Sequence, residues 1–199
     1  MFFDRMPTVA SPVLDVFLER LRQMAAPRVL ELGARRSDPR TSTLHKSWAP
    51  HASRFVGVDY QEGLDVDVLA DIHRLSQTFD RGSFDAIISA STFEHVKYPW
   101  IAAVELAKVL SLGGIIFVQT HQSFPLHSHP CDYWRFTRES LEGLFNGSIG
   151  FQVLCTDYEF PCRIVSKQEP GLRNRESFLN VRLCARKSRE APDEWIPQW

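Results

Sequence analysis

The sequence predicts an α/β protein with a doubly wound, mostly parallel sheet and an antiparallel C-terminal hairpin. Short apolar runs alternate with helical patterns through residues 28–120, an order typical of parallel strands joined by helices. These runs carry few polar residues, as expected of strands buried on both faces. Residues 151–186 instead hold two runs of alternating polarity with no helical pattern between them, which indicates a hairpin.

The first expected element is a helix that begins at Ser11 and Pro12, residues suited to the N-cap and the first helical position. Pro27 ends this helix. The next run, RVLELG at 28–33, is closed by glycine and predicts a buried strand. Residues 37–39 (Ser-Asp-Pro) then predict the start of a second helix. Apolar residues recur on one face of the first helix: Val13, Phe17, Leu21 and Met24.

Three further strands are expected in the first half of the chain. RFVGVD at 54–59 ends in an acid, and DVDVLAD at 65–71 follows after only five residues. A parallel crossover usually takes about a dozen residues or more, so we expect this third strand to be rudimentary. SFDAIISA at 83–90 predicts the next strand.

A helix over 100–114, stopped by Gly113 or Gly114, is expected before a central strand at 115–120. Residues 121–136 form a loop rich in histidine and aromatic residues.

A short helix begins near Thr137. Strands at 151–160 and 177–186 follow, joined by a polar loop, and we expect Trp195 and Trp199 to pack onto the domain.

Length, composition and charge favour one soluble domain and exclude several functional classes. The chain has 199 residues and a net charge of −1, which argues against broad attraction to nucleic acid or to an anionic membrane. We see neither a secretion signal nor a run approaching the roughly 20 apolar residues of a membrane span, so we expect a cytoplasmic protein. The scattered cysteines favour reduced thiols over a disulfide framework: Cys131, Cys155, Cys162 and Cys184.

Ligands of doubly wound sheets bind beyond the carboxyl ends of the strands, where the strand order switches. This rule points to polar or small residues at five strand ends. A dinucleotide would also need G-x-G-x-x-G after the first strand, but positions 33, 35 and 38 are Gly, Arg and Asp, so we expect no pyrophosphate site and no nicotinamide dehydrogenase. The strand-end residues are Gly33, Asp59, Asp71, Ser89 and Thr120.

Six stretches in order carry a family resemblance that spans residues 28–138. The chain resembles the class I S-adenosylmethionine-dependent methyltransferases of the large small-molecule group (methyltransferase type 11-like). That resemblance implies a Rossmann-like fold over a single domain, 1–199: a helical segment (1–27), a cofactor-binding half (28–120), and an acceptor loop with a short helix and hairpin (121–199). The stretches are VLELG, FVGVDY, VLADIHRL, FDAIISASTFEHVKYPW, LAKVLSLGGIIFVQT and DYWRFT.

The resemblance implies S-adenosylmethionine as cofactor, which carries no phosphate and needs no phosphate loop. Gly33 would lie under the methionine portion, and the Glu31 carboxylate would shape that pocket near the positive sulfonium. Arg35 stands where the family usually has a second glycine. An arginine there either pairs with the cofactor carboxylate or points to solvent.

The remaining cofactor contacts implied by the resemblance come from the next three strands. Asp59 would hold the ribose hydroxyls, with Tyr60 near the adenine. Asp71 and the Ile72 backbone would meet the adenine edge, although Asp71 could instead only cap the following helix. Ser89 would line the far wall.

Candidate catalytic bases follow the central strands: His95, His121 and His129. Methyl transfer to a hydroxyl requires orientation of the acceptor and removal of a proton. His95 belongs to a Glu-His pair that is structural or lines the acceptor pocket in many relatives. His127, His129 and Cys131 lack a fourth ligand and match no zinc pattern, so we expect no metal. Asp132 and Arg135 could pair and fix this loop.

The leading functional hypothesis is a methyltransferase that methylates an oxygen of a small polar acceptor, such as a sugar or a secondary-metabolite intermediate, by in-line transfer. The chain has no basic run or added RNA-binding domain, which argues against RNA as the acceptor. The alternative is a methyltransferase fold that binds a ligand or partner without catalysis, and Arg35 is the feature that favours it.

Overall fold

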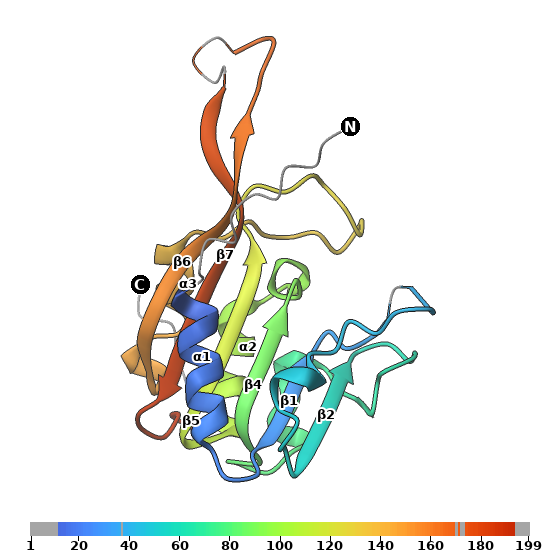
Figure 1. The fold of residues 1–199 in the computed structure, drawn as a ribbon, viewed down its shortest axis with the longest axis vertical. Coiled ribbons are helices and arrows are strands. Elements are labelled where there is room, and N and C mark those ends of the chain that lie inside the picture. The colour runs from blue at the N-terminus through green and yellow to red at the C-terminus, as the bar shows by residue number, and fades with distance from the viewer. Residues whose placement is uncertain (1–11, 37, 170, 172–173, 194–199) are drawn as a thin grey trace.

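The computed structural model describes residues 12–36, 38–169, 171 and 174–193, which form a seven-stranded sheet in the order β3-β2-β1-β4-β5-β7-β6 (Figure 1). The five strands β1 to β5 run parallel, and β7 pairs antiparallel with both β5 and β6. The predicted fold class is therefore confirmed. The strands are β1 (Arg28–Leu32), β2 (Arg54–Asp59), β3 (Val68–Leu69), β4 (Phe84–Ala90), β5 (Leu110–His121), β6 (Phe151–Ile164) and β7 (Arg175–Lys187).

Helices cover both faces of the sheet, so its central strands are buried on each side. On one face, α1 inserts Phe17 between Trp48 and Phe117 of β5, and the ring centroids lie 6.2 and 5.5 Å from that of Phe17. On the other face, α2 packs with η2 and against β5, and α3 packs against β6 and β7 (Figure 1). The helices are α1 (Pro12–Gln23), η1 (Lys46–Trp48), η2 (Ile72–Gln77), η3 (Phe93–His95), α2 (Pro99–Val109), α3 (Arg138–Leu144) and η4 (Gly147–Ile149).

Most predicted elements are present, including the rudimentary β3, which has two residues. Helix α3 begins after Thr137, whose hydroxyl accepts from the Ser140 N–H in a capping box. Among the described helices, none is both long and apolar enough to cross a bilayer. The predicted packing of Trp195 and Trp199 falls outside the described residues, as does Ser37.

The prediction of a helix that starts at residues 37–39 is wrong, because the described residues between β1 and β2 form only a turn and the single-turn η1. Asp38 accepts from the Arg40 N–H at 2.9 Å, but helical bonding stops after one turn. The Ser42 hydroxyl accepts from the Leu44 N–H at 3.2 Å. Hydroxyl and β-branched residues compete with helical bonding in this way, so the segment TST cannot propagate the turn.

The boundary between α2 and β5 also differs from the prediction. Helix α2 ends at Val109, and β5 begins at Leu110, so Gly113 and Gly114 lie within a strand. Gly113 has a φ of +83°, and a Cβ on Gly114 would lie 2.9 Å from the Asp85 carbonyl oxygen. The register of β4 and β5 shifts at this point, so the glycines serve a bulge and a close strand approach.

The C-terminal hairpin is longer than predicted. Cross-strand pairs continue through Pro161–Phe178 to Ile164–Arg175, inside the segment expected to be loop. Figure 1 shows this end of the β6–β7 ribbon extending beyond the rest of the sheet. Continued alternation across a polar segment explains the difference, since edge strands exposed to water need no apolar run.

Candidate functional site

Gly33 directly follows β1 and has a φ of +67°. A Cβ at this position would lie 2.3 Å from the Thr92 hydroxyl oxygen, far inside van der Waals contact. The Thr92 hydroxyl in turn lies 3.1 Å from the Ala90 carbonyl and 3.3 Å from the Leu32 carbonyl. Glycine is therefore required here for both its backbone conformation and the close approach of two loops.

Asp59 ends β2 and is half-buried. Its carboxylate accepts from the backbone N–H groups of Gln61 at 3.0 Å and Arg35 at 3.2 Å. A carboxylate offers about four acceptor positions, so positions remain for hydroxyl donors. The neighbouring Tyr60 side chain is 67% exposed, as a ring that receives a flat ligand would be before binding.

The Arg35 side chain lies along the turn that follows Asp59. Its Nε donates to the Glu62 carbonyl at 3.2 Å, and its Cγ would be 2.8 Å from a Cβ on Gly63. Arg35 is exposed, and pairing with a cofactor carboxylate, one of its two expected roles, stays a prediction.

Glu31 is buried in β1, and both of its carboxylate oxygens contact His45. Oε2 accepts from the His45 N–H at 2.8 Å, and Oε1 lies 2.7 Å from Nδ1. The His45 ring packs on Trp48 with centroids 4.1 Å apart. Glu31 therefore anchors the segment that replaces the expected helix, an interaction for which the sequence spacing carries no signal.

Asp71 caps η2, as the alternative interpretation of this residue proposed. Its Oδ1 accepts from the His73 N–H at 2.9 Å and lies 2.7 Å from Nδ1 of the same residue. Burial opposes ionisation, but the contacts with His73 outweigh it and lower the pKa of Asp71. Nε2 of His73 lies 3.2 Å from the Tyr98 N–H and accepts from it. Ile72 is half-buried beside the cap.

Ser89 lies at the end of β4, fully buried and opposite Leu32 of β1. Its hydroxyl has no hydrogen-bond partner among the described residues. An unpartnered buried hydroxyl costs about 1–3 kcal/mol and is uncommon in native proteins. The wall formed by β4 therefore offers an unused polar group.

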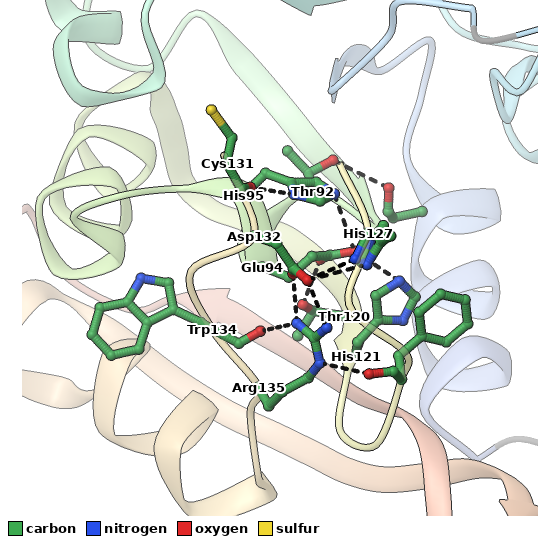
Figure 2. Close-up of polar contacts among 12 residues, drawn as sticks. Thr92, Glu94, His95, Thr120, His121, His127, Cys131, Asp132, Trp134 and Arg135 are labelled. Carbon is green, nitrogen blue, oxygen red and sulfur yellow. Dashed lines mark hydrogen bonds and ion pairs between the residues drawn. The ribbon is translucent and has the colours of Figure 1, made fainter. Parts of the chain in front are cut away.

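A second group of polar side chains surrounds Glu94, which is fully buried in η3 (Figure 2). Oε2 accepts from the Thr120 hydroxyl at 2.7 Å, and Oε1 lies 3.0 Å from Nε2 of His121 and 3.8 Å from Nε2 of His95. Burial raises the pKa of Glu94, but the contacts with His121 and Thr120 outweigh it, so the pKa is lowered. Burial lowers the pKa of His121, but Glu94 outweighs it, so that pKa is raised.

The loop after β5 is fixed over this cluster by the predicted pair of Asp132 and Arg135, which is confirmed. Two guanidinium nitrogens contact the two carboxylate oxygens at 2.6 and 2.9 Å, and Arg135 also donates to the carbonyls of Phe124 and Pro125. Hydrogen bonding from Arg135 lowers the pKa of Asp132.

The fold brings two of the three predicted catalytic histidines together, His95 and His121, at the carboxyl ends of β4 and β5. His129 is exposed and lies outside the cluster. Sequence analysis missed Glu94 as their common partner and Asn180 of β7, whose Oδ1 lies 3.0 Å from Nδ1 of His121 although the two residues are 59 positions apart. A contact of that separation leaves no local sequence pattern.

Comparison with known proteins agrees with this arrangement. Residues 40–118 match the model of a family described as a methyltransferase domain. A search of curated proteins found no match. Several solved structures share the fold at low sequence identity.

Three of these structures illustrate the likeness. The YcgJ protein from Bacillus subtilis is 16% identical, with a TM-score of 0.62 over 89% of this chain and 98% of its own. A SAM-dependent methyltransferase from Archaeoglobus fulgidus is 14% identical, with a TM-score of 0.60 over 87% and 94% of the two chains. The 1,6-didemethyltoxoflavin-N1-methyltransferase from Burkholderia thailandensis, solved with 1,6-didemethyltoxoflavin and S-adenosylhomocysteine, is 15% identical, with a TM-score of 0.60 over 88% and 76%.

The strand order places Gly33 and Asp59 after the carboxyl ends of the neighbouring strands β1 and β2, and this arrangement agrees with the matched domain. Residues 40–118 thus match a methyltransferase-domain family, and the chain shares its fold with S-adenosylmethionine-dependent methyltransferases of known structure.

Proposed function

We propose that this protein binds S-adenosylmethionine at the carboxyl ends of β1, β2 and β4 and transfers its methyl group to an oxygen of a small polar acceptor. The observation that carries the proposal is the pairing of Gly33 with Asp59. A glycine with a left-handed backbone and no room for a Cβ follows β1, and a carboxylate with acceptor positions to spare ends the neighbouring β2. Ribose hydroxyls are donors that suit this carboxylate, and the absence of a phosphate loop agrees with a cofactor that has no phosphate.

The other cofactor contacts remain proposals that the positions support. Tyr60 is exposed beside Asp59, and Asp71 is exposed at the start of η2, where its free acceptor position and the Ile72 backbone meet an adenine edge. The unpartnered Ser89 hydroxyl supplies a polar group to the wall. Glu31 acts through His45, which holds the segment after β1 in place.

The chemistry is an in-line displacement in which the acceptor oxygen attacks the methyl carbon and the carbon–sulfur bond breaks. S-adenosylhomocysteine leaves as a neutral thioether, and the hydroxyl proton passes to a base. The protein contributes orientation and exclusion of water.

Among the candidate bases, His95 suits this role best. Its Nδ1 lies 2.6 Å from the Cys131 carbonyl oxygen, which can only accept, so Nδ1 carries the proton and Nε2 is free to receive one. The His95 side chain is 26% exposed, whereas that of His121 is 8% exposed and faces Glu94. His129 stays a candidate that would have to approach with its loop.

A small acceptor agrees with a cytoplasmic protein of net charge −1 and with the loop over the histidines. The Burkholderia structure holds a small acceptor and a cofactor product together, although that enzyme is named for methylation of nitrogen. The preference for oxygen here rests on the proposed histidine base.

A non-catalytic binding protein is the second candidate, favoured by Arg35. Its side chain is bound along the turn after Asp59, and the segment after β1 lacks the expected helix. Both features alter the loop that approaches the cofactor.

The test has two steps on folded, full-length protein. S-adenosylhomocysteine is titrated by calorimetry, and methyl-labelled S-adenosylmethionine is then incubated with panels of sugars, phenols and amines. We expect saturable binding and a labelled O-methyl product. Binding without methyl transfer to any member of the panels favours the second candidate. Labelled N-methyl products would show that the acceptor atom is nitrogen and not oxygen. The absence of binding refutes the methyltransferase and leaves only a partner-binding role for the second candidate.

A further inference from the structure

Three segments that are distant in the sequence bring ligand-type side chains around the buried carboxylate of Glu94. Glu94 comes from η3, His121 from the end of β5, and His127 from the loop that follows (Figure 2). One carboxylate oxygen and one ring nitrogen from each histidine all lie within 4.8 Å of one another.

The Glu94 carboxylate has an unused oxygen that faces this cluster. Oε1 is buried and has no hydrogen-bond partner among the described residues, although Nε2 of His121 lies only 3.0 Å away. The two atoms are close without the alignment of an N–H donor and its acceptor. Buried carboxylate oxygens are normally hydrogen-bonded or bound to a metal, so Oε1 has an unused acceptor position.

Both histidines are oriented by a hydrogen bond from one ring nitrogen. Nδ1 of His121 lies 3.0 Å from Asn180 Oδ1, and Nδ1 of His127 lies 3.1 Å from the Pro125 carbonyl oxygen. These oxygens accept, so each Nδ1 carries a proton and each neutral ring keeps a lone pair on Nε2. Metal-binding histidines are held in this way by a carbonyl or carboxylate behind the ring.

We propose that Glu94, His121 and His127 bind one divalent transition-metal ion of the zinc class. Imidazole with a carboxylate suits zinc, cobalt or nickel, whereas magnesium and calcium prefer oxygen ligands alone. Three protein ligands leave a fourth position open, which is the arrangement of catalytic rather than structural zinc sites. His95 lies near the same carboxylate oxygen, with Nε2 3.8 Å from Glu94 Oε1.

The distances are compatible with one ion. Tetrahedral zinc with bonds of about 2.1 Å places its ligand atoms about 3.4 Å apart. The Glu94–His121 pair is near this value at 3.0 Å. The pairs with His127 lie within 4.8 Å, and because His127 is carried by a loop, it can close the remaining distance without a shift of the sheet.

An overlapping set of His95, His127 and Asp132 is a weaker candidate. Both oxygens of Asp132 are bound by Arg135 at 2.6 and 2.9 Å, so that carboxylate already has its cation. The site around Glu94 also explains why sequence spacing predicted no metal. The ligands are not the H-x-H-x-C residues of one loop, and only His127 belongs to both sets.

The inference goes beyond the proposed function, because metal binding is measured without cofactor or acceptor. Protein without a histidine tag is stripped of metal and titrated with zinc by calorimetry, and cobalt is added in parallel to record its visible absorption. His127→Ala is the test variant, since a half-exposed loop residue should not be needed for folding. His129→Ala, on the same loop, and Cys131→Ser are the matched controls, with circular dichroism to verify the fold of each.

We expect one saturable site per chain and cobalt bands typical of nitrogen and oxygen ligands. His127→Ala should weaken zinc binding at least about 100-fold, more than the 10–100-fold loss typical of residues behind a ligand. Asn180→Ala should weaken zinc binding by about 10–100-fold, and both control variants should keep the wild-type affinity for zinc. The proposal is overturned if the wild type shows no saturable site, if either control loses as much affinity as His127→Ala, or if cobalt shows thiolate bands.

Discussion

Replacement of Gly33 by alanine tests the close approach of the loop after β1 to the loop after β4. The new Cβ would lie 2.3 Å from the Thr92 hydroxyl oxygen, and a φ of +67° would have to be held by a residue with a side chain. The left-handed backbone costs about 1–2 kcal/mol, and forced overpacking costs about 1–3 kcal/mol. Gly33→Ala should therefore lower the free energy of unfolding by about 2–5 kcal/mol.

A double-mutant cycle separates the two contributions. Thr92→Ala removes the hydroxyl and leaves only its Cβ, 3.3 Å from the new methyl group, so the double variant should recover the overpacking cost of about 1–3 kcal/mol. Thr92→Ala alone loses weak hydrogen bonds worth about 0.5–1.5 kcal/mol. Urea unfolding followed by far-UV circular dichroism measures all four proteins.

Gly143→Ala is the matched control, because Gly143 lies in α3 with open space around its Cα and should gain about 0.5–1 kcal/mol. Additive effects of Gly33→Ala and Thr92→Ala, within about 0.5 kcal/mol, would refute the contact between them. An unchanged stability of Gly33→Ala would refute the whole argument for glycine at this position.

Two further predictions concern ion pairs away from the site. Hydrogen bonds from Arg28 and Ser111 lower the pKa of Asp85 to about 2, so this carboxylate stabilises the fold above its ordinary pKa near 4, and the stabilisation is lost as the pH falls toward 2. Asp85→Asn should lower the free energy of unfolding by about 1–2 kcal/mol at pH 7, after allowance for the partial exposure of the pair. An equally steep loss of stability in acid for the variant would contradict this assignment. Arg182 is buried between Asp157 and Glu159 of β6, with nitrogen–oxygen distances of 2.8 and 2.5 Å. Arg182→Met should lower the free energy of unfolding in urea by about 3 kcal/mol, because two partly buried carboxylates lose their cation. A change below about 0.5 kcal/mol would show that water screens these ion pairs.

The sheet was largely predictable because its strands are buried on both faces, and burial leaves continuous apolar runs. The wrong predictions fall where a residue type typical of a helix start or a helix end serves another local role. Gly113 and Gly114 resemble a helix stop but serve a bulge. Residues 37–39 resemble a helix start, but the polar residues after them do not support a helix.

The candidate site was predictable only where a strand end fixes its residues. Gly33 and Asp59 follow directly from the rule on carboxyl ends. The partnership of Glu31 with His45, and that of His121 with Glu94 and Asn180, depends on contacts across the fold. Such contacts are set by packing and loop path, neither of which leaves a spacing in the sequence.

Calorimetric titration of S-adenosylhomocysteine into the wild type, Asp59→Ala and Asp85→Asn tests the central claim most directly. The claim is that a cofactor with a ribose binds at the carboxyl ends of β1 and β2 through Asp59. Loss of charge-assisted hydrogen bonds worth about 1.5–3 kcal/mol predicts that Asp59→Ala binds about 10–200-fold more weakly. Asp85, at the opposite end of β4, should leave the affinity unchanged. Equal affinity of Asp59→Ala and the wild type would contradict the claim, as would the absence of binding by folded wild-type protein.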